Sequence, residues 1–434
     1  MRGHPAPIYR RLPHGPSGMG RAEVARHQRA RIFGAMIESV SQRGYHATTV
    51  AHVIALAGVS RRCFYEQFAN KEDCFLATYD IVVARARKRV IDAWQEQRGW
   101  SNRLQASCTA LLEHVAEAPK GPRLVLVDSL GVGPQARERM QLAGLAFERL
   151  IAIIFQLAPD GGQAPPLAAR AIVGGVRHVA FKRLLEGRES ELPLLAEEFL
   201  DWIEVYRSPA AVRLGSLALV TPPRMPPAPA EFLTRKDRRA RALGSVVHLT
   251  LDSGYASLTD PQIAHFAGIS TEAFHRQFAN KEACFLAVLD EFVAEALVTV
   301  RASIAEAHSW PESVNLAMGA FVGYLLAHEA LLRIAFIDVF EVGPAMVGRM
   351  TRSIEALTDV LAEGGPQPLR GPAIAVEAIT GAVWAIISSY VSNARLSRLP
   401  GLVDHLAYVV LAPYLGPRAA AASIHASRMQ PHAA

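Results

Sequence analysis

Cysteine is scarce in this 434-residue sequence, and its four cysteines are not spaced for chemistry. No CxxC pair occurs, and four thiols are too few for a disulfide framework in so long a chain. The fifteen histidines form no ligand cluster, so neither a metal nor a cofactor is predicted. We therefore expect reduced thiols and a cytoplasmic protein. The cysteines are Cys63, Cys74, Cys108 and Cys284.

The sequence also lacks a long hydrophobic run. Its longest uncharged apolar stretch, about residues 378–391, is interrupted by Ser388, Ser389 and Tyr390. The N-terminus carries arginine, proline and glycine where a secretory signal has an apolar segment. No convincing alternation of apolar and polar residues indicates strands. We therefore predict an all-α protein that does not associate with membranes.

Positive charge is in modest excess but unevenly placed. The formal net charge is +6. Residues 1–31 hold seven arginines and one acid, Glu23, while residues 235–241 hold four arginines and Lys236 against Asp237. These basic arms precede two similar segments. Attraction to a polyanion is their functional interpretation, and a solvated surface is the alternative.

Those similar segments belong to an internal repeat. Residues 44–77 and 254–287 are identical at 17 of 34 positions without a gap. The same offset relates Arg139 to Arg349, so the repeat spans whole domains. Further equivalent pairs are Trp100 and Trp310, Asp128 and Asp338, and, after a slip of three residues, Gly174 and Gly381.

Each copy begins with helices whose ends the sequence marks. A helix is predicted before Gly44, because its apolar residues recur on one face. They are Ile32, Phe33, Met36, Ile37 and Val40. A second helix is predicted over residues 50–57. Its equivalent in the second copy starts with Asp260 as a side-chain cap, followed by Pro261.

A glycine turn and two further helices follow. Gly58 supplies the turn, and Ser60 caps a short helix whose core side is Phe64 and Phe68. Asn70 then caps a longer helix. Two short helices joined by a glycine turn, the second with polar residues outward, have the form of a helix-turn-helix. That unit places its second helix in the major groove of DNA.

The stretch GYHATTVAHVIALAGVSRRCFYEQFANKEDCFLA, residues 44–77, resembles the DNA-binding head of the TetR family of transcriptional regulators. The likeness runs in order through the Thr-Thr pair, AGVS, FY and NKE. Residues 254–287, GYASLTDPQIAHFAGISTEAFHRQFANKEACFLA, are similar to the same head more loosely. The resemblance implies a helical C-terminal domain that binds a small ligand, mediates dimerisation and changes the spacing of two heads.

The resemblance also implies which residues contact DNA. Phosphate contacts fix the register of a protein on DNA, whereas Arg can read guanine. In the first copy these residues are Thr49, Ser60, Tyr65 and Lys71 near phosphates, with Arg61 and Arg62 near base edges. In the second copy they are Thr259, Ser270, Thr271, His275 and Lys281. The simpler alternative is that these side chains only cap, pack or face solvent.

The second head has a less favourable recognition helix. Glu272 occupies the position of Arg62, and an acid facing phosphates is unfavourable, although glutamate can accept a hydrogen bond from cytosine. A degenerate head that only keeps the fold is the alternative. If both heads bind, the unequal helices predict an operator whose two half-sites differ.

The repeat and the composition divide the chain into seven segments. Proline-rich sequence without helical period separates the copies and is typical of a semi-rigid linker. The predicted segments are a basic arm (1–24), a first head (25–72), a first regulatory domain (73–207), the linker (208–232), a second head (233–282), a second regulatory domain (283–418) and a disordered tail (419–434).

The sequence leaves alternatives for two features of the regulatory domains, namely the residues that line an effector cavity and the way in which the two copies pair. Phe147, His178, Trp384 and Tyr390 are candidates for lining an apolar effector cavity, with ordinary helix packing as the alternative for each. The two copies can pair within one chain as an internal pseudo-dimer, because a linker raises the effective concentration of one copy for the other. A homodimer of two chains is the alternative.

No enzyme is predicted. Residues 123–136 contain a G-x-G-x-x-A pattern, but Glu341 replaces Gly131 in the second copy and Pro134 lies inside the pattern. We expect a helix-to-helix corner there. His328 and Glu329 do not belong to an HExxH zinc motif, because Leu332 occupies the position of its second histidine. No G-x-S-x-G motif occurs in the sequence either.

Together these patterns predict a sequence-specific transcriptional regulator. We expect it to bind double-stranded operator DNA as a repressor, to be released by an unidentified small-molecule effector, and to associate with the nucleoid. The alternative is a helical ligand-sensing or scaffolding protein whose heads no longer bind DNA. DNA affinity that falls steeply with salt would distinguish the first class from the second.

Overall fold

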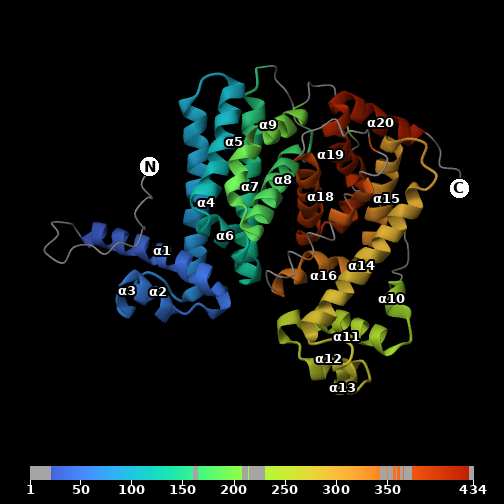
Figure 1. Cartoon of the computed structure of the whole chain (residues 1–434), viewed down its shortest axis with the longest axis horizontal. Coiled ribbons are helices and arrows are strands. Elements are labelled where there is room, and N and C mark those ends of the chain that lie inside the picture. The colour runs from blue at the N-terminus through green and yellow to red at the C-terminus, as the bar shows by residue number, and fades with distance from the viewer. Residues whose placement is uncertain are drawn as a thin grey trace. The chain divides into compact units, whose positions relative to one another are not determined.

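The computed structural model consists, over the residues that it describes, of helices (Figure 1). Within the part of the chain that it describes there is no strand, which confirms the predicted all-α class. The described residues are 21–159, 165–207, 214, 230–342, 349, 355–357, 359–361, 365 and 374–429. The predicted arm therefore lies outside the described residues up to residue 20, as does most of the predicted linker.

The two copies have the same order of helices through the head and the start of the regulatory domain. The first copy contains α1 (Arg21–Ala47), α2 (Val50–Ala57), α3 (Arg61–Tyr65), α4 (Lys71–Glu96), α5 (Trp100–Glu117), α6 (Lys120–Leu126), η1 (Asp128–Gly131), α7 (Pro134–Gln156), α8 (Ala168–Glu186), η2 (Glu189–Leu195) and α9 (Ala196–Val205). The corner formed by α6 and η1 confirms that residues 123–136 are not a strand and nucleotide loop.

The second copy adds a short helix before its head and one after its last core helix. Its elements are α10 (Glu231–Thr234), α11 (Arg238–Ser253), η3 (Tyr255–Ser257), α12 (Asp260–Phe266), α13 (Thr271–His275), α14 (Lys281–Ile304), α15 (Trp310–Ala327), α16 (Glu329–Phe336), η4 (Asp338–Glu341), α18 (Ala375–Ser392), η5 (Leu396–Leu402), α19 (Val403–Leu415) and α20 (Pro417–Met429).

The chain forms two compact units whose boundaries differ from those of the copies. Unit 1 contains residues 1–146 and 180–194, and unit 2 contains residues 147–179 and 195–434. The first part of α8 and all of α9 therefore pack with the second copy. A division of the chain by its repeat does not predict this exchange, because contacts rather than sequence order define a compact unit.

The head of unit 1 is built around phenylalanine. Phe64 and Phe68 are 0% and 2% exposed, and their ring centroids lie 5.5 Å apart. Phe75 of α4 and Ile32 and Met36 of α1 complete this core. Burial of each such side chain contributes about 1.5–3 kcal/mol. The core side predicted for α3 is thus confirmed, and the opposite face of α3 is turned outward.

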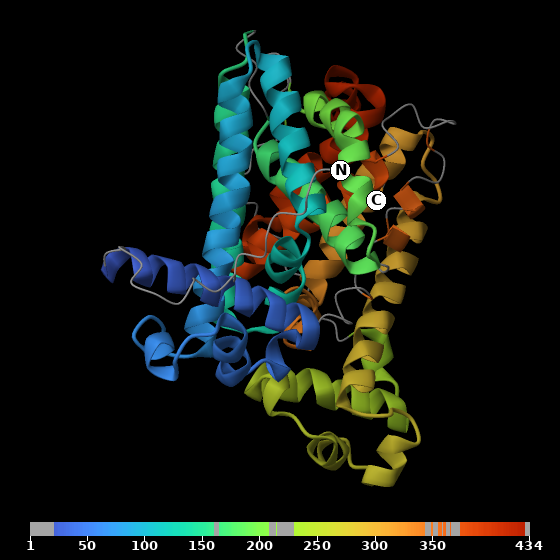
Figure 2. The same ribbon diagram turned by 60° about the vertical axis from the view of Figure 1, so that its left-hand side comes forward.

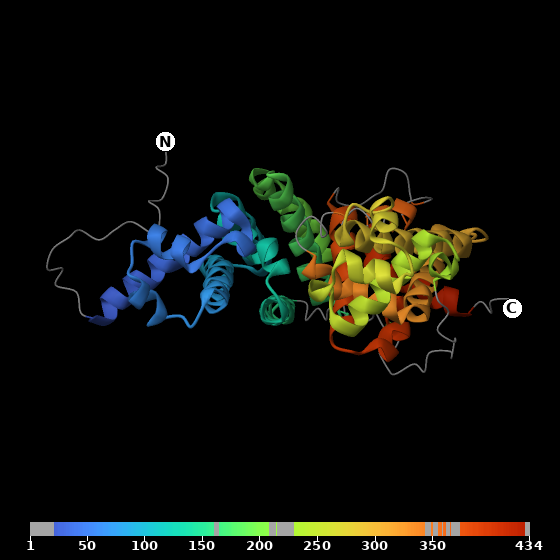
Figure 3. The same ribbon diagram turned by 90° about the horizontal axis from the view of Figure 1, so that it is seen from below.

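The head of unit 2 lies at the N-terminal end of α14. Figure 2 shows α11, α12 and α13 at the foot of this long helix, and Figure 3 shows the same head in front of the other helices of unit 2. α14 packs against α15, and α15 packs against α19. One continuous helix thus joins the second head to the second regulatory domain.

Within unit 2, α8 and α18 cross at two glycines that the repeat makes equivalent. A Cβ atom on Gly174 would lie 2.3 Å from the Cβ of Ala385 and 2.8 Å from the carbonyl oxygen of Gly381. A Cβ on Gly381 would lie 2.2 Å from the Cβ of His178 and 2.7 Å from the carbonyl oxygen of Gly174. The three-residue slip also relates His178 to Ala385. The contacts are therefore reciprocal, as across a two-fold axis.

Side chains on both sides of this crossing add hydrogen bonds. The Tyr206 hydroxyl of α9 donates to the carbonyl oxygen of Val409 in α19 at 2.9 Å. The Arg170 guanidinium of α8 donates to the Ser389 hydroxyl of α18 at 2.6 Å. Trp202 is fully buried beside them. The last helices of the two copies thus share one core.

The C-terminal segment differs from the prediction. α20 runs over Pro417–Met429 and packs against α15 and α19, so the predicted disordered tail (419–434) is wrong over residues 419–429. The sequence is rich in alanine, and Ala420 and Ile424 fall on one face, where they are 0% and 1% exposed. Residues 430–434 lie outside the described residues.

One helix has the length and composition of a membrane span. Among the described residues α18 meets this test by itself, and α15 with α16 meets it only as a pair bent by 100°. Of the α18 window, 61% is buried inside the protein. Its contacts with α8 and α19 account for this apolar composition as that of a core helix.

Candidate nucleic-acid interface and effector cavity

The turn of the first head is fixed by local hydrogen bonds. Gly58 has φ 61°, a left-handed conformation that favours glycine, and this turn separates α2 from α3. The Ser60 hydroxyl accepts from the backbone N–H of Cys63 at 3.1 Å, which confirms the predicted cap. Arg31 donates to the carbonyl oxygens of Ala57 and Gly58 from α1. The start of α3 is thus held in a defined orientation.

The outward face of α3 carries the predicted base-reading residues. Arg61 and Arg62 are exposed, and Tyr65 is 47% exposed. The Arg62 guanidinium pairs with Glu66 at 2.8 Å, with 89% and 59% of the two side chains exposed. An exposed i,i+4 pair contributes only about 0.3–0.5 kcal/mol, so Arg62 can leave it for a guanine or a phosphate.

Two predicted phosphate contacts flank this face. Thr49 caps α2, where its hydroxyl accepts from the backbone N–H of His52 at 3.3 Å. The Lys71 ammonium donates to the carbonyl oxygen of Tyr45 at 3.0 Å and lies 4.1 Å from the centre of that ring. Burial lowers the pKa of Lys71 and raises the pKa of Tyr45 to about 12. Two of the three donors of Lys71 remain for a phosphate.

The second head repeats this geometry, with the equivalent threonine as the cap of its first short helix. Thr259, rather than the predicted Asp260, is the N-cap of α12, and its backbone N–H donates to the Gln262 side chain at 2.9 Å. The Asp260 carboxylate instead accepts from the backbone N–H of Lys281 at 2.7 Å. Asp260 lies one position inside the helix, so its side chain reaches α14. Ser270 caps α13, as predicted.

The recognition face of the second head is less basic than that of the first. Thr271 is partly buried, while Glu272 is exposed and its pKa is lowered by a hydrogen bond with Ser270. The His275 ring lies 3.7 Å from Asp260. This face therefore carries an acid near its N-terminus and a histidine that already has an acidic neighbour.

Lys281 differs from Lys71 in how many of its donors are used. Its ammonium donates to three backbone carbonyl oxygens, at 2.7, 3.2 and 3.4 Å. All three donors of a lysine ammonium are thereby satisfied within the head. The three acceptors belong to Leu258, Tyr255 and Ala256.

The second basic arm is paired inside the protein. Arg239 donates to the Glu291 carboxylate of α14 at 3.1 Å, and Arg235 lies 4.0 Å from the same group. Glu295 accepts from the backbone N–H of Phe232 at 2.7 Å, which ties α10 to α14. Two of the five basic residues that suggested a polyanion-binding arm are thus paired with one acid more than fifty residues away in sequence.

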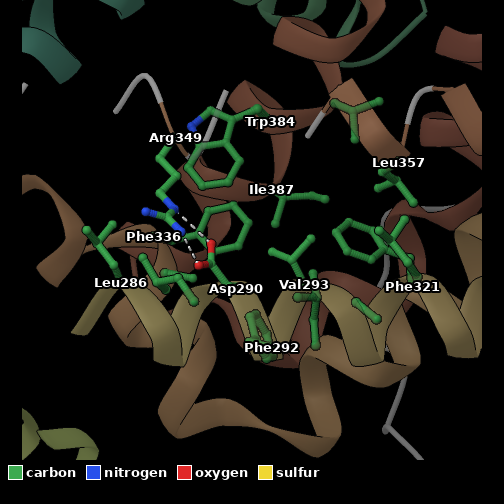
Figure 4. Close-up of a pocket in the computed structure, with 16 residues that line it drawn as sticks. Leu286, Asp290, Phe292, Val293, Phe321, Phe336, Arg349, Leu357, Trp384 and Ile387 are labelled. Atoms are coloured by element: carbon green, nitrogen blue, oxygen red, sulfur yellow. Dashed lines mark hydrogen bonds and ion pairs between the residues drawn. The ribbon is translucent and has the colours of Figure 1, made fainter. Parts of the chain in front are cut away.

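Unit 2 also contains an apolar cavity between α14, α15, α16 and α18 (Figure 4). Its lining residues are Leu286, Leu289, Asp290, Phe292, Val293, Ala296, Leu297, Phe321, Leu325, Ala335, Phe336, Arg349, Leu357, Val383, Trp384 and Ile387. Asp290 and Arg349 are the only charged residues among them, and they form an ion pair. Such a cavity suits a mainly apolar ligand with one polar group.

The predicted effector residues fall in different places. Trp384 lines the cavity, where its ring stacks on Phe336 with centroids 4.0 Å apart and planes 9° apart. His178 lies at the α8–α18 crossing, and Tyr390 is buried elsewhere on α18. Phe147 is half-buried on α7. The fold therefore does not bring the four candidates, which were chosen only for their aromatic or polar character, into one site.

Sequence reasoning missed the ion pair of this cavity. Arg349 Nε and Nη2 donate to the two oxygens of Asp290 at 3.0 and 2.5 Å. The first copy has the same pair, with Arg139 Nη1 2.8 Å from Asp80. The two aspartates and the two arginines are each related by the offset of 210 residues. The presence of both charged residues in both copies was the sequence signal that could have identified this ion pair.

The geometry defines a class of protein. Two helix-turn-helix heads present the outward faces of α3 and α13, and long helices behind them enclose an apolar cavity in unit 2. No group of three or more His, Cys, Asp or Glu side chains that could hold a metal ion occurs within the described ranges. These features are typical of helix-turn-helix regulators with a ligand-sensing domain.

Comparison with known proteins assigns both heads to one family of domains. The sequence profile described as "Bacterial regulatory proteins, tetR family" matches residues 32–78 and again residues 247–288. The chain thus contains two segments that match the N-terminal domain of the TetR family. The predicted resemblance is thus confirmed for both heads.

Similar proteins include regulators from several bacteria. The HTH-type transcriptional activator FasR of Mycolicibacterium smegmatis is 25% identical over 131 residues, which cover 30% of this chain and 60% of FasR. The fatty acid degradation regulator FadR from Bacillus halodurans has a TM-score of 0.36 at 18% identity, over 41% of this chain and 96% of that protein. FadR from Bacillus subtilis in complex with stearoyl-CoA has a TM-score of 0.37 at 17% identity, over 40% and 96%.

Proposed function

We propose that this protein is a transcriptional regulator that binds one operator with two heads carried by a single chain. The observation that carries this proposal is the reciprocal crossing of α8 and α18 at Gly174 and Gly381. A contact between equivalent positions is what an isologous dimer interface requires, and here both partners belong to one chain. The two copies then act as an internal pseudo-dimer, in place of the homodimer that most such regulators need.

The first head makes the stronger DNA contacts in this proposal. Thr49, Ser60 and Lys71 bind phosphates beside Tyr65, while Arg61 and Arg62 read base edges. In the second head the DNA contacts are weaker. They are made by Thr259, Ser270, Thr271 and His275. The recognition helix of the first head begins with two arginines, and that of the second begins with a threonine and a glutamate. The two heads therefore prefer different half-sites of the operator.

Regulation by a small effector is the second part of the proposal. The apolar cavity of unit 2 borders α14, which begins at the second head. A ligand in this cavity changes the contacts of α14 and with them the position of the head that it carries. Binding of the effector and binding of DNA are then coupled. In this proposal the effector weakens operator binding and so relieves repression.

DNA binding by the first head tests this function. The full chain is first used to select operators from random duplex DNA, and the affinity for the selected duplex is measured over a range of salt. We expect the logarithm of the association constant to fall with the logarithm of salt, at a slope of about −0.9 for each phosphate contact. Arg62→Ala is expected to reduce specific affinity by about 1–3 kcal/mol and to relax the preference at one base pair.

A matched variant in the second head serves as the control. Arg276→Ala removes an arginine from the segment after α13 and is expected to have the smaller effect, because Glu272 already lowers the charge there. Selection that recovers no preferred sequence, with weak binding unaffected by Arg62→Ala, would favour the alternative of a ligand-sensing or scaffolding protein.

A further inference from the structure

The effector cavity has a strong division between apolar and charged surface. Of the sixteen described residues that line it, fourteen are apolar and the remaining two are Asp290 and Arg349. Figure 4 shows this pair toward one side of the cavity, with Leu357 and Phe321 on the opposite side and Ile387 between them. A ligand that fills the space must therefore be apolar along its body, and it meets the described charges where it reaches this pair.

The Asp290–Arg349 pair is held weakly enough to exchange. Its side chains are 40% and 45% exposed. Ion pairs as exposed as this one have a small net effect, since water competes for both charges. The guanidinium, however, matches a second carboxylate or a phosphate equally well, with two parallel hydrogen bonds. An anionic ligand group can thus replace Asp290 on Arg349.

The pair joins two parts of the second copy that bear on its head. Asp290 lies on α14, ten residues after the Asn280 cap that follows the second head. Arg349 is on the other side of the pair, in the part of the chain after η4 (Asp338–Glu341), and η4 contacts η3 of that head. Loss of the pair therefore removes one link to α14, the helix that carries the head.

We propose that the cavity binds amphiphiles with an apolar body and one anionic group, and that this group displaces Asp290 from Arg349. The inference deepens the proposed function, since it rests on this cavity being the effector site. The displaced Asp290 carboxylate then lies beside a second negative charge, which repels it. Because the Asp290 side chain is already partly exposed, it turns toward solvent. The ion pair that joins α14 to Arg349 is thereby broken.

Binding of three eight-carbon probes to the full chain, without DNA, tests this inference. The probes are octanoate, octyl phosphate and 1-octanol, and binding is followed by calorimetry and by tryptophan fluorescence, with Trp384→Phe identifying the signal of the cavity. We expect at least one anion to bind roughly tenfold more tightly than 1-octanol. The tighter of the two anions identifies the source as a carboxylate or a phosphate ester.

Two substitutions distinguish exchange on Arg349 from simple apolar binding. Arg349→Met is expected to abolish the preference for the anion and to leave the affinity for 1-octanol unchanged. Asp290→Asn removes the competing carboxylate and is expected to tighten anion binding. Arg139→Met, which breaks the equivalent pair of the first copy, is the matched control and leaves anion binding at this site unchanged. Circular dichroism checks that each variant is folded.

Equal affinity for octanoate, octyl phosphate and 1-octanol would overturn the inference, and so would an anion preference that survives Arg349→Met. Both results are obtained in the absence of DNA. They therefore leave the proposed operator binding untouched, and a failure of operator binding in turn leaves these measurements interpretable.

Discussion

Two equivalent lysines differ in what they can offer to DNA. Lys71 uses one donor within the head and has two left, whereas Lys281 gives all three to backbone carbonyl oxygens. We expect Lys71→Met to lower the magnitude of the salt slope of operator binding by about 0.9, the value for one phosphate contact. Lys281→Met is expected to leave the slope unchanged and to lower the free energy of unfolding by about 1–3 kcal/mol, because it leaves carbonyl groups without a partner.

These two outcomes are measured by titration of DNA at several salt concentrations and by urea denaturation. Equal changes of slope in the two variants would contradict the distinction. The sequence predicts the same role for both lysines, because it aligns them within an identical NKE motif. The number of donors already in use depends on the turn at residues 255–258, which only the folded chain reveals.

A partly buried carboxyl group, that of Asp128, makes the stability of unit 1 depend on pH. Burial raises the pKa of Asp128 to about 6, despite the opposing influence of Arg123. The unfolded value is about 3.9, so the folded state prefers the protonated form. The stabilisation from this group is complete below about pH 4 and is lost as the pH rises through 6.

Asp128→Asn removes this dependence. We expect the variant to be more stable than the parent chain by about 1–3 kcal/mol at pH 7.5, and the difference to vanish near pH 4. Urea denaturation at both pH values, followed by circular dichroism, measures it. A stability difference that is the same at pH 4 and pH 7.5 would show that Asp128 does not titrate in this range.

At the scale of helices, the crossing of α8 and α18 has little tolerance for added atoms. A methyl group on Gly174 would lie 2.3 Å from the Cβ of Ala385 and 2.8 Å from a backbone oxygen that cannot move aside easily. Gly174→Ala is therefore expected to destabilise unit 2 by about 1–3 kcal/mol and to weaken operator binding. Thermal denaturation and DNA titration measure the two effects.

Gly144→Ala is the matched control for this variant. Gly144 lies within α7, and a Cβ there meets no atom within 4 Å. Removal of a helical glycine is expected to stabilise the chain by about 0.5–1 kcal/mol. If both variants changed stability in the same direction and by the same amount, close contact of the two helices would not be the reason for glycine at position 174.

The sequence predicts the helices of the heads well because their signals are local. Ser60 and Asn70 cap the helices that they were expected to cap, and Phe64 and Phe68 face the core. Each of these features depends on residues three or four positions apart. The wrong cap at Asp260 is a misjudgement by one residue, since Thr259 and Asp260 are both good caps and only the backbone conformation distinguishes them.

Features that depend on distant contacts were not predicted. The association of α8 and α9 with the second copy arises from Gly174 and Gly381, 207 residues apart. α20 forms because α15 and α19 supply the surface that buries Ile424. The effector cavity was predicted from aromatic residues, whereas the charged groups among its described lining residues are Asp290 and Arg349, which meet only in the folded chain.

At the scale of the whole molecule, the unequal heads predict an asymmetric operator. The first recognition helix starts with Arg61 and Arg62, and the second starts with Thr271 and Glu272. We expect the double substitution Thr271→Arg and Glu272→Arg to shift selection toward two copies of the half-site that the first head prefers. Affinity for that symmetric duplex is expected to rise at least about tenfold, which corresponds to ~1.4 kcal/mol from new base contacts.

Sequencing of the selected duplexes and titration of the symmetric one measure this change. The parent chain, tested on the same symmetric duplex, is the control. If the double variant selected the same operator as the parent, the second head would not read bases through α13.

The central claim is that one chain supplies both heads for one operator. Native mass spectrometry of the full chain with a selected operator duplex tests it most directly, because the mass counts chains and duplexes in the complex. The account predicts one chain per duplex at protein concentrations just sufficient for saturation, and a monomer of 47.1 kDa without DNA. A complex that contains two chains for each duplex, and none with a single chain, would contradict it.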